Sequence, residues 1–432
     1  MRKGWKEVLL GEIISIKHGY GFKGEFFVDA PNKNLLLTPG NFAIGGGFKG
    51  DKMKYYEGPI SSDFILSPGN VIVTMTDLSK QADTLGFSAK VPDEPRNIYL
   101  HNQRIGLVSL KNDDCNLEFI YWLLRTYSYQ RYIAGSSSGA TVKHTSPTKI
   151  YSAKVTFPKS KETQRKIASI LSAYDDLIEN NLKRIKLLEE KAQLTYEEWF
   201  VKMRFPGYET AVFDEVTGLP KGWEKKTIGD VCKASGGGTP SRASDEYWLD
   251  GDVTWYSPTD LSKASSLCVL DSSQKITELG LKKSSAKLLD TNSFMMTSRA
   301  TIGLFALVNK PFTTNQGFIN VTPINEFEKE YLLYNFKHRV EEFKGHATGA
   351  TFLELSKSKF NALDILWPSD ESLKQFNKIT SLLHTQLFNL TIQNRLLKEA
   401  RDILLPRLMS GMIDVDTLSK QVVEEMETLK ST

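Results

Sequence analysis

Residues 167–199 read IASILSAYDDLIENNLKRIKLLEEKAQLTYEEW. Large apolar residues recur in this stretch at alternating intervals of four and three, which is the spacing of a coiled-coil seam. Neither proline nor glycine interrupts 161–204, so we expect one long helix there. The seam consists of Ile167, Leu171, Tyr174, Ile178, Asn181, Ile185, Leu188, Ala192, Thr195 and Trp199.

A second stretch, at about 371–410, has the same spacing. Each predicted helix would be roughly 60 Å long and would expose its apolar stripe unless it had a partner. Pro406 lies near the end of the second stretch and is expected to bend the helix or to stop it early. The second seam consists of Phe376, Thr380, Leu383, Leu387, Leu390, Asn394, Leu397, Arg401, Leu404 and Leu408.

Each seam carries one asparagine near its middle, and the two asparagines occupy opposite seam positions. Asn181 is followed by a seam residue four positions later, whereas Asn394 is followed by one after three positions. This difference predicts antiparallel helices in which the two asparagines meet and fix the register. The alternative is that each asparagine faces solvent beside an ordinary apolar core. The antiparallel arrangement also brings Leu188 near Leu387 and Tyr174 near Arg401.

The chain repeats itself in order. Gly4-Trp5 returns as Gly222-Trp223 at an offset of 218, Asn102-Gln103 as Asn315-Gln316 at 213, and Gly139-Ala140-Thr141 as Gly349-Ala350-Thr351 at 210. An ordered series of this kind indicates two similar halves. Each half has short apolar runs that read as strands, then a short helical patch, then one long helix. The runs are at 70–76, 105–110, 293–297 and 317–321, and the patches are at 117–132 and 326–343.

These patterns predict an α+β protein with two similar globular domains, separated by two long antiparallel coiled-coil helices and related by a pseudo-twofold axis. A twofold-related pair of modules at a fixed spacing suits duplex DNA, where half-sites recur about every helical turn. We expect a first domain at 1–158, a first helix at 159–205, a second domain at 206–368, a second helix at 369–412 and a C-terminal tail at 413–432.

Composition excludes several classes of protein. The 432 residues include no apolar run long enough for a transmembrane helix, and no apolar segment of a secretory signal follows Met1. Three widely separated cysteines form neither a disulfide framework nor a zinc pattern, so we expect a cytoplasmic protein. The formal charge of +4 permits a polyanionic partner without requiring one.

The sequence also lacks the patterns of an enzyme. It contains neither a phosphate-binding GxxxxGK[ST] motif nor the Asn/Asp-Pro-Pro-aromatic tetrapeptide expected of an amino-methyltransferase. The six histidines show no HxxxH or HExxH spacing. We therefore expect a non-catalytic chain with no metal site and no cofactor of its own.

Several motifs, most of them in the second half, carry a family resemblance. They are LPKGW at 219–223, GGGTPSR at 236–242, WYSPTDL at 255–261, SRATIG at 298–303, TNQG at 314–317, EWFV at 198–201 and LLPRLMSG at 404–411. With these motifs the chain resembles, over nearly its whole length, the specificity (S) subunit of type I restriction–modification enzymes. The first half lacks GGTPSR and looks like a different recognition subtype.

The resemblance implies a non-catalytic reader of double-stranded DNA. Its two target-recognition domains each bind one half of a bipartite, asymmetric site, while the helices set the spacer and dock the modification (methyltransferase) subunits. Those partners use S-adenosylmethionine, and the restriction subunits use ATP and magnesium; no membrane partner is implied. Two alternatives stay open: an S-like chain of another restriction–methylation system, and a coiled-coil scaffold with two carbohydrate- or protein-binding modules.

Residues that both halves share cannot distinguish two different half-sites, so Asn102-Gln103 and Asn315-Gln316 are better read as scaffold or as backbone-positioning groups. The readers should be polar and basic residues that differ between the halves. For several candidates the alternative is a role without base contact. The lysines and Arg242 would then be solvated, Arg299 would form a structural ion pair, and Tyr256 would belong to the core. The candidates in the first half are Tyr20, Lys23, Lys49, Lys52, Lys54, Thr76, Lys80, Arg104, Lys143 and His144, and those in the second are Thr239, Ser241, Arg242, Tyr256, Ser257, Thr259 and Arg299.

Overall fold

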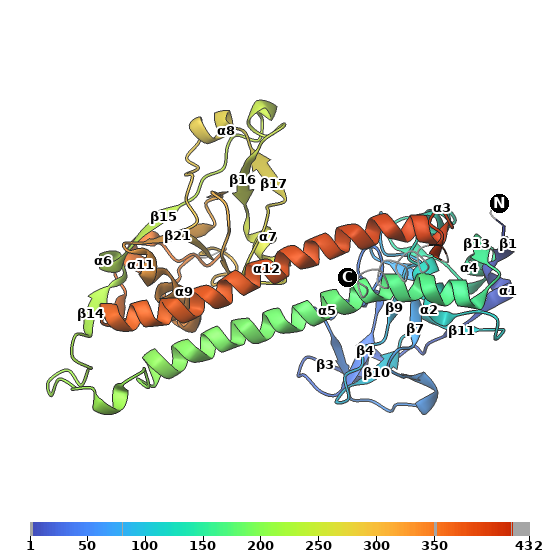
Figure 1. Ribbon diagram of the computed structural model, residues 1–432, viewed down its shortest axis with the longest axis horizontal. Coiled ribbons are helices and arrows are strands. Elements are labelled where there is room, and N and C mark those ends of the chain that lie inside the picture. The colour runs from blue at the N-terminus through green and yellow to red at the C-terminus, as the bar shows by residue number, and fades with distance from the viewer. Residues whose placement is uncertain (1–2, 80, 350–351, 416, 418–432) are drawn as a thin grey trace, which may run out of the picture. The chain divides into compact units, whose positions relative to one another are not determined.

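The computed structural model describes residues 3–79, 81–349, 352–415 and 417. These residues form two compact units. Unit 1 comprises Met1–Asp176 and Lys398–Thr432, and unit 2 comprises Leu177–Leu397. Each unit therefore contains one globular domain together with a part of each long helix. The elements are labelled in Figure 1.

The globular part of unit 1 is built on two sheets. The first is antiparallel and has the order β2 (Ile14–His18), β11 (Ile105–Leu110), β7 (Val71–Thr74) and β9 (Ser88–Lys90). All four residues of β7 are buried, as expected for a central strand made of Val, Ile and Thr. The second sheet has the order β3 (Phe27–Val28), β5 (Lys54–Tyr56), β4 (Asn34–Leu37), β10 (Ile98–His101) and β6 (Ile65–Leu66), and within it β4 and β10 are parallel.

Shorter elements complete unit 1. The predicted patch at 117–132 forms two helices rather than one, because the Thr126 hydroxyl donates to the Leu123 carbonyl at 2.8 Å and Thr126 takes extended backbone angles. The elements are β1 (Trp5–Leu9), α1 (Leu10–Ile13), β8 (Thr76–Asp77), α2 (Leu117–Leu123), α3 (Tyr127–Gly135), β12 (Lys143–His144), α4 (Pro147–Tyr151) and β13 (Lys154–Pro158), with β1 pairing β13 and β8 pairing β12.

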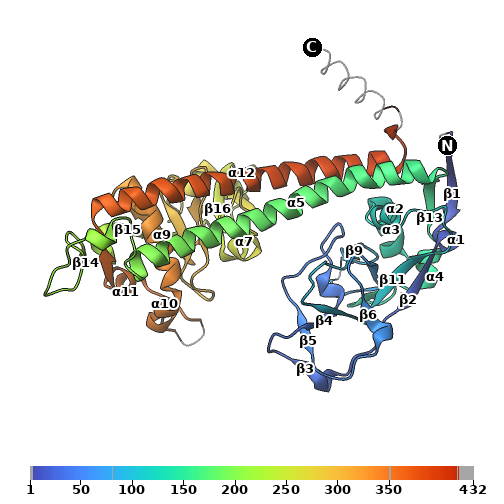
Figure 2. The same ribbon diagram turned by 60° about the horizontal axis from the view of Figure 1, so that its bottom comes forward.

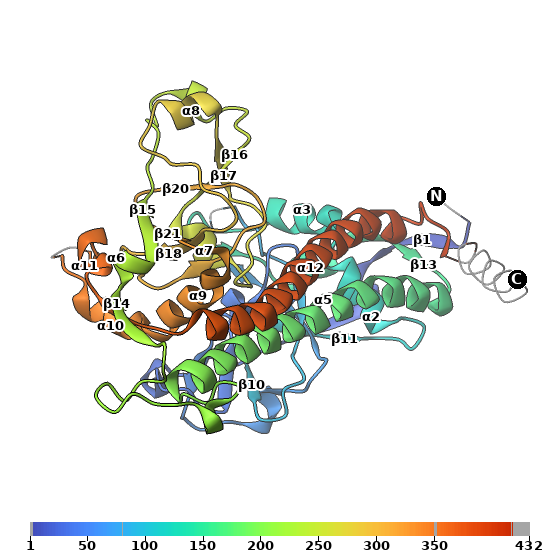
Figure 3. The same cartoon turned by 60° about the vertical axis from the view of Figure 1, so that its left-hand side comes forward.

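Unit 2 repeats this plan, and most of its strands are labelled in Figure 3. Its first sheet has the order β15 (Cys232–Gly236), β21 (Phe318–Pro323), β18 (Phe294–Thr297) and β19 (Phe305–Ala306). Its second has the order β17 (Gln274–Ile276), β16 (Val253–Tyr256) and β20 (Thr313–Thr314), with β16 and β20 parallel. The remaining elements are β14 (Glu224–Thr227), α6 (Ile228–Val231), α7 (Pro258–Lys263), α8 (Glu278–Lys282), α9 (Lys329–His338), α10 (Val340–His346), α11 (Lys357–Asn361) and β22 (Asp364–Trp367), with β14 pairing β22.

The internal repeat of the sequence is thus a repeat of structure. The strand order β2-β11-β7-β9 in unit 1 matches β15-β21-β18-β19 in unit 2, and each unit has one parallel strand pair in its second sheet. Every predicted strand run contains a strand, and the predicted patch at 326–343 contains α9 and the start of α10. The predicted α+β class with two similar halves is confirmed.

The two long helices are α5 (Lys161–Tyr196), which continues into a π-helical turn at Glu197–Val201, and α12 (Asp370–Met409). Pro406 lies inside α12 and does not stop it. The proline lacks one N–H donor, and α12 continues three residues further, to Met409. The helix ends just before Gly411, whose φ is +73°. Within the described residues, no helix is both long and apolar enough to cross a membrane.

The helices lie side by side and antiparallel in each unit (Figures 1 and 2). In unit 2, Asn181 contacts Asn394, whereas Tyr196, later on α5, packs on Phe376, earlier on α12. In unit 1, Asp175 pairs with Arg401. Most apolar seam residues are buried and belong to the same apolar clusters as the globular domains, whereas a few, such as Tyr174 and Leu397, are half-buried. In each unit the helix pair and the domain therefore share one core.

Candidate nucleic-acid interface

In unit 2, backbone hydrogen bonds join three polar segments at the ends of strands. The Gly238 N–H donates to the Thr314 carbonyl at 2.9 Å, and the Ser298 N–H donates to the Gly317 carbonyl at 2.9 Å. The side-chain oxygen of Asn315 accepts from the Gly317 N–H at 2.8 Å and so closes the turn between them. A fourth segment, 353–355, joins them through the Leu355 N–H, which donates to the Ser298 carbonyl at 2.9 Å. We call residues 237–242, 298–300, 314–317 and 353–355 the loop cluster of unit 2.

The glycine-rich loop of this cluster holds Arg242 in a defined place. The guanidinium carbon lies 3.6 Å from the centre of the Trp248 ring, and Nη2 donates to Gln274 Oε1 at 2.8 Å. The Trp248 indole in turn donates to the Ser241 carbonyl at 3.0 Å. Arg242 is thus exposed but stacked, so less side-chain entropy is lost when it binds a further group.

The other predicted residues of unit 2 divide into accessible and occupied side chains. Thr239 donates its hydroxyl to Gln316 Oε1 at 2.6 Å within the loop cluster, and Ser241, Thr259 and Arg299 are exposed. The Ser257 hydroxyl instead donates to Asp260 at 2.7 Å and caps α7. Its lone pairs remain available, but its proton does not.

Tyr256 corrects one of the predictions. Its side chain is fully buried in an apolar cluster of unit 2, with its ring centre 6.3 Å from that of Phe312. Burial raises the pKa of its phenol, with smaller contributions from Asp271 and Asp260. Tyr256 and its neighbour Trp255 are buried in two different apolar clusters, so Tyr256 supports β16 and cannot contact DNA in this conformation.

Unit 1 contains the same set of hydrogen bonds. The Tyr20 N–H donates to the His101 carbonyl at 2.8 Å, and the Met75 N–H donates to the Arg104 carbonyl at 2.9 Å. The side chain of Asn102 accepts from the Arg104 N–H at 3.0 Å, as Asn315 does from Gly317. Residues 19–23, 75–77, 101–104 and 143–145 therefore form the loop cluster of unit 1, and both asparagines have the scaffold role inferred from their recurrence.

Tyr20 and the basic residues of the first domain are largely accessible. Tyr20 is 45% exposed, and its ring centre lies 5.2 Å from that of Phe64. Lys23 lies 3.8 Å from Glu25 and Lys49 lies 3.2 Å from Asp51, but surface ion pairs of this kind are weak and leave the lysines free to exchange partners. Arg104 and His144 are exposed and Lys143 is half-buried, whereas Lys80 lies outside the described residues.

Thr76 requires a second correction. It is 3% exposed, and its hydroxyl lies 3.2 Å from His144 Nδ1, so it supports His144 rather than reaching a base itself. Its neighbour Asp77 is also structural. Burial by itself would raise the pKa of Asp77, but hydrogen bonds from Thr84 and Ser79 lower it below the ordinary value.

The sequence did not predict three residues that lie in or beside the loop cluster of unit 2. Trp248 and Gln274 hold Arg242, and Glu354 lies opposite Arg299 with 3.9 Å between Oε2 and Nε. Glu354 could have been found from the repeat, because it follows His144 at the same offset of 210 that separates the two Gly-Ala-Thr triplets. No sequence signal marked Gln274, whose position depends on the pairing of β16 with β17.

The helix-pairing residues come together within each unit. Asn181 Nδ2 donates to Asn394 Oδ1 at 3.0 Å, and both side chains are buried. Leu188 and Leu387 belong to the same apolar cluster of unit 2. In unit 1, Arg401 pairs with Asp175, the residue after the predicted partner Tyr174, which is half-buried.

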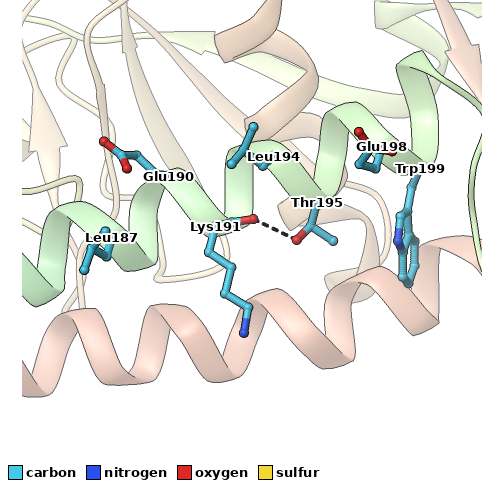
Figure 4. Close-up of a pocket in the computed structure, with 7 residues that line it drawn as sticks. All are labelled: Leu187, Glu190, Lys191, Leu194, Thr195, Glu198 and Trp199. Carbon is cyan, nitrogen blue, oxygen red and sulfur yellow. Dashed lines mark hydrogen bonds between the residues drawn. The ribbon is translucent and has the colours of Figure 1, made fainter.

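A groove of about 430 Å³ runs along α5 in unit 2 (Figure 4). Two of its leucines are strongly exposed, Leu187 at 63% and Leu194 at 59%. The Thr195 hydroxyl is turned back to the Lys191 carbonyl at 2.7 Å, which leaves the apolar groups as the main contact surface. The groove is lined by Leu187, Glu190, Lys191, Leu194, Thr195, Glu198 and Trp199.

Neither metal binding nor thiol chemistry is supported by the described residues. Among them, no three or more His, Cys, Asp or Glu side chains are grouped to hold a metal ion. All three cysteines are free and buried, and burial raises the pKa of the Cys232 thiol to about 12. A thiol of this kind is not a nucleophile at neutral pH.

Comparison with known proteins agrees with this picture. The family model of the type I restriction modification DNA specificity domain matches residues 2–190 and 220–399. The MjaIX specificity subunit of Methanocaldococcus jannaschii is 35% identical over 42% of this chain, and the matched part spans 42% of the length of that relative. The HindI specificity subunit of Haemophilus influenzae is 28% identical over 68% of this chain and 77% of its own.

The fold has a solved counterpart. The S subunit of the type I restriction–modification system from M. genitalium superposes with a TM-score of 0.54 at 16% identity, covering 94% of this chain and 96% of that one. At this identity the superposition shows a shared fold alone, whereas the family model matches the amino-acid sequence. That model matches two separate segments, which together cover well over half of the residues. The chain therefore belongs to the type I restriction–modification DNA specificity family.

Proposed function

We propose that this chain is the DNA-recognition subunit of a type I restriction–modification complex, and that each globular domain reads one half of a bipartite, asymmetric site. The supporting observation is the pair of loop clusters. Both have the same backbone hydrogen bonds, and they present different side chains. Two clusters with the same backbone framework and different side chains suit two half-sites that differ in sequence.

The accessible residues have the chemistry of DNA contacts. Arg242 and Arg299 in unit 2 and Arg104 in unit 1 have the reach and donor geometry for guanine or phosphate. Gln103 and Gln316 are exposed at equivalent places in the two clusters. Because these amides are identical, we assign them contacts that both half-sites share.

We assign the helices two further roles. The buried Asn181–Asn394 layer fixes how α5 and α12 pair, and this register bears on the spacer between the half-sites. The exposed leucines of the α5 groove offer an apolar surface to a modification subunit. S-adenosylmethionine, ATP and magnesium belong to the partner subunits in this proposal, because the sequence has neither the phosphate-binding motif for ATP nor the tetrapeptide of an amino-methyltransferase.

Methylome sequencing tests the proposal directly. Cells that contain the modification subunit are compared with and without this chain. The expected result is a bipartite motif that loses adenine methylation when the chain is deleted and regains it when the chain is restored. If no motif depends on the chain while the modification subunit is present and active, the proposed function is wrong.

A further inference from the structure

The two loop clusters contain an identical backbone feature, which we call the clip. In unit 1 the clip is the pairing of 75–77 with 143–145, where the Thr145 N–H donates to the Met75 carbonyl at 3.0 Å and His144 pairs antiparallel with Thr76. In unit 2 it is the pairing of 298–300 with 353–355. There the Leu355 N–H donates to the Ser298 carbonyl at 2.9 Å.

The central pair of the unit 2 clip is Arg299 and Glu354, which form an antiparallel bridge. Each clip is also closed on its other side by a second bridge, Ser138 with His144 in unit 1 and Thr348 with Glu354 in unit 2. Thr76 and Arg299 therefore occupy the same place in the fold, and so do His144 and Glu354.

The repeated glycine explains why the clip backbone is the same. Gly139 has φ +96° and Gly349 has φ +144°. A Cβ at Gly139 would lie 2.0 Å from the Val142 carbonyl oxygen, and one at Gly349 would lie 2.1 Å from the Phe352 carbonyl oxygen. Only glycine fits at either position, so the repeated glycine holds the same backbone course at both clips.

The side chains at the central pair do differ. In unit 1, Thr76 is buried and supports the exposed His144 through the 3.2 Å contact to Nδ1. In unit 2, both members are accessible, Arg299 at 46% and Glu354 at 47% of their side-chain surface, with 3.9 Å between the charged atoms. An exposed ion pair this long contributes little to stability, so exchanging it for other partners costs little.

The backbone beside Arg299 is strained. Ala300 has φ +61°, a left-handed conformation that disfavours alanine, and its N–H donates to the Leu353 carbonyl at 3.0 Å. Strain of this kind persists only where the surrounding structure imposes it, and it concentrates at functional sites. Here the left-handed conformation of Ala300 sets the direction in which the chain continues after Arg299.

The chemistry of the pair matches one kind of base pair. A guanidinium donates two hydrogen bonds to O6 and N7 of guanine, and a carboxylate accepts one from N4 of cytosine. We propose that Arg299 and Glu354 together read a G·C base pair in the half-site of the second domain, and that His144 reads the equivalent base pair in the other half-site. This inference rests on the proposed function, because it presupposes that the domains bind DNA.

The test uses the whole complex, assembled from the chain and its modification subunits, on DNA duplexes that carry the methylome motif with one position randomised at a time. Arg299→Ala and Glu354→Ala should each reduce the preference for G·C about tenfold or more at one position of one half-site. All other positions should keep their preferences. His144→Ala should alter one position in the other half-site alone.

Lys344→Ala serves as the matched control, because Lys344 forms an exposed ion pair with Glu341 at 2.7 Å on α10, outside the loop cluster, and the charge change equals that of Arg299→Ala. Its preferences should equal those of the native chain. Arg299→Lys and Glu354→Gln retain most of the side-chain bulk and should still lose the preference, which keeps the inference testable if an alanine variant fails to fold.

Two results would overturn the inference. If the Arg299 variants weaken binding to every sequence equally, the residue contacts phosphate and reads no base. If they keep every preference and the full affinity, the clip is structural. In both cases the chain-dependent motif would still exist, so the failure would be separate from a failure of the proposed function, in which no motif depends on the chain.

Discussion

Asp175 should be the most sensitive single position on the long helices of unit 1. One of its oxygens accepts from Arg125 Nη1 at 2.6 Å, and the other accepts from Arg401. Arg125 is only 3% exposed, and its Nε also donates to the Gly45 carbonyl at 3.0 Å. The carboxylate thus neutralises a buried guanidinium that ties the glycine-rich loop at 45–47 to the helix pair.

Asp175→Ala would remove this carboxylate and leave Arg125 buried without its counter-charge. Breaking a buried ion pair in this way costs about 3–5 kcal/mol. Because 29% of the Asp175 side chain is exposed, water can replace part of the interaction, and we expect the lower end, about 3 kcal/mol. For a unit of this size that loss corresponds to a decrease in melting temperature of about 6–12 °C.

The assay is urea unfolding followed by hydrogen exchange, which reports each unit separately. Amides at 42–48 and 117–126 should lose protection at lower urea in Asp175→Ala, and those of the unit 2 strands should not. Asp176→Ala is the control, since Asp176 is exposed on the next position of α5 and should cost less than about 0.5 kcal/mol. Equal effects of the two substitutions would refute the reasoning.

The same carboxylate predicts a pH dependence. Burial alone would raise the pKa of Asp175, but Arg125 and Arg401 together lower it below the ordinary value of 3.8. A depressed folded-state pKa contributes stability above the unfolded value, and that contribution disappears as the pH falls through the folded value. The difference in unfolding free energy between the native chain and Asp175→Asn should therefore be constant from pH 7 to about 5 and shrink below about pH 4. A difference that grew on acidification would contradict this assignment.

Three further substitutions test the packing. Asn181→Leu should cost about 1–3 kcal/mol, because it leaves Asn394 with an unpaired buried amide, whereas replacing both by leucine should restore or exceed native stability in urea unfolding. Gly411→Ala places a Cβ 2.7 Å from a tryptophan ring and should cost clearly more in a thermal melt than Gly4→Ala, which meets nothing within 4 Å at a similar positive φ. His384→Ala removes the side chain that bonds both a buried phenol and a buried carboxylate, and should lower the unfolding free energy of unit 2 by about 2–4 kcal/mol.

The features that could be predicted from sequence are those that repeat with a local period. The spacing of the seams depends only on the helix, so it predicted most of the apolar residues of α5 and α12 that are buried, and the offset of their asparagines predicted that these two side chains meet. The repeat predicted two similar halves. Both predictions use distances along one chain and need no knowledge of the tertiary packing.

The candidate site was less predictable, since exposure depends on which face of a strand meets the core. Tyr256 and Ser257 are adjacent in sequence, yet Tyr256 is buried and Ser257 is half-buried. Thr76 sits at a strand end where a polar residue would ordinarily face solvent, and the clip covers it. A single sequence does not show either burial, because His144 contacts Thr76 from 68 residues away and Phe312 contacts Tyr256 from more than 50 residues away.

The buried contacts show how far side chains can change while this fold keeps its geometry. In unit 1 the Trp122 indole donates to Ser172 at 2.9 Å, and Ser172 donates to Glu118 at 2.5 Å. At positions 212 residues later, Tyr334 bonds His384 at 2.7 Å, and His384 bonds Glu330 at 3.1 Å.

These two networks join a domain helix to a long helix in the same place, with a hydroxyl in one unit and an imidazole in the other. Gly139 and Gly349 recur unchanged because the backbone at each position admits no other residue. Because the interior accepts either a serine or a histidine in these networks, the exposed Arg299–Glu354 pair should accept a substitution more easily. The substitutions at Arg299 and Glu354 should therefore leave the unfolding free energy nearly unchanged, within about 0.5 kcal/mol, and alter only what the second domain binds.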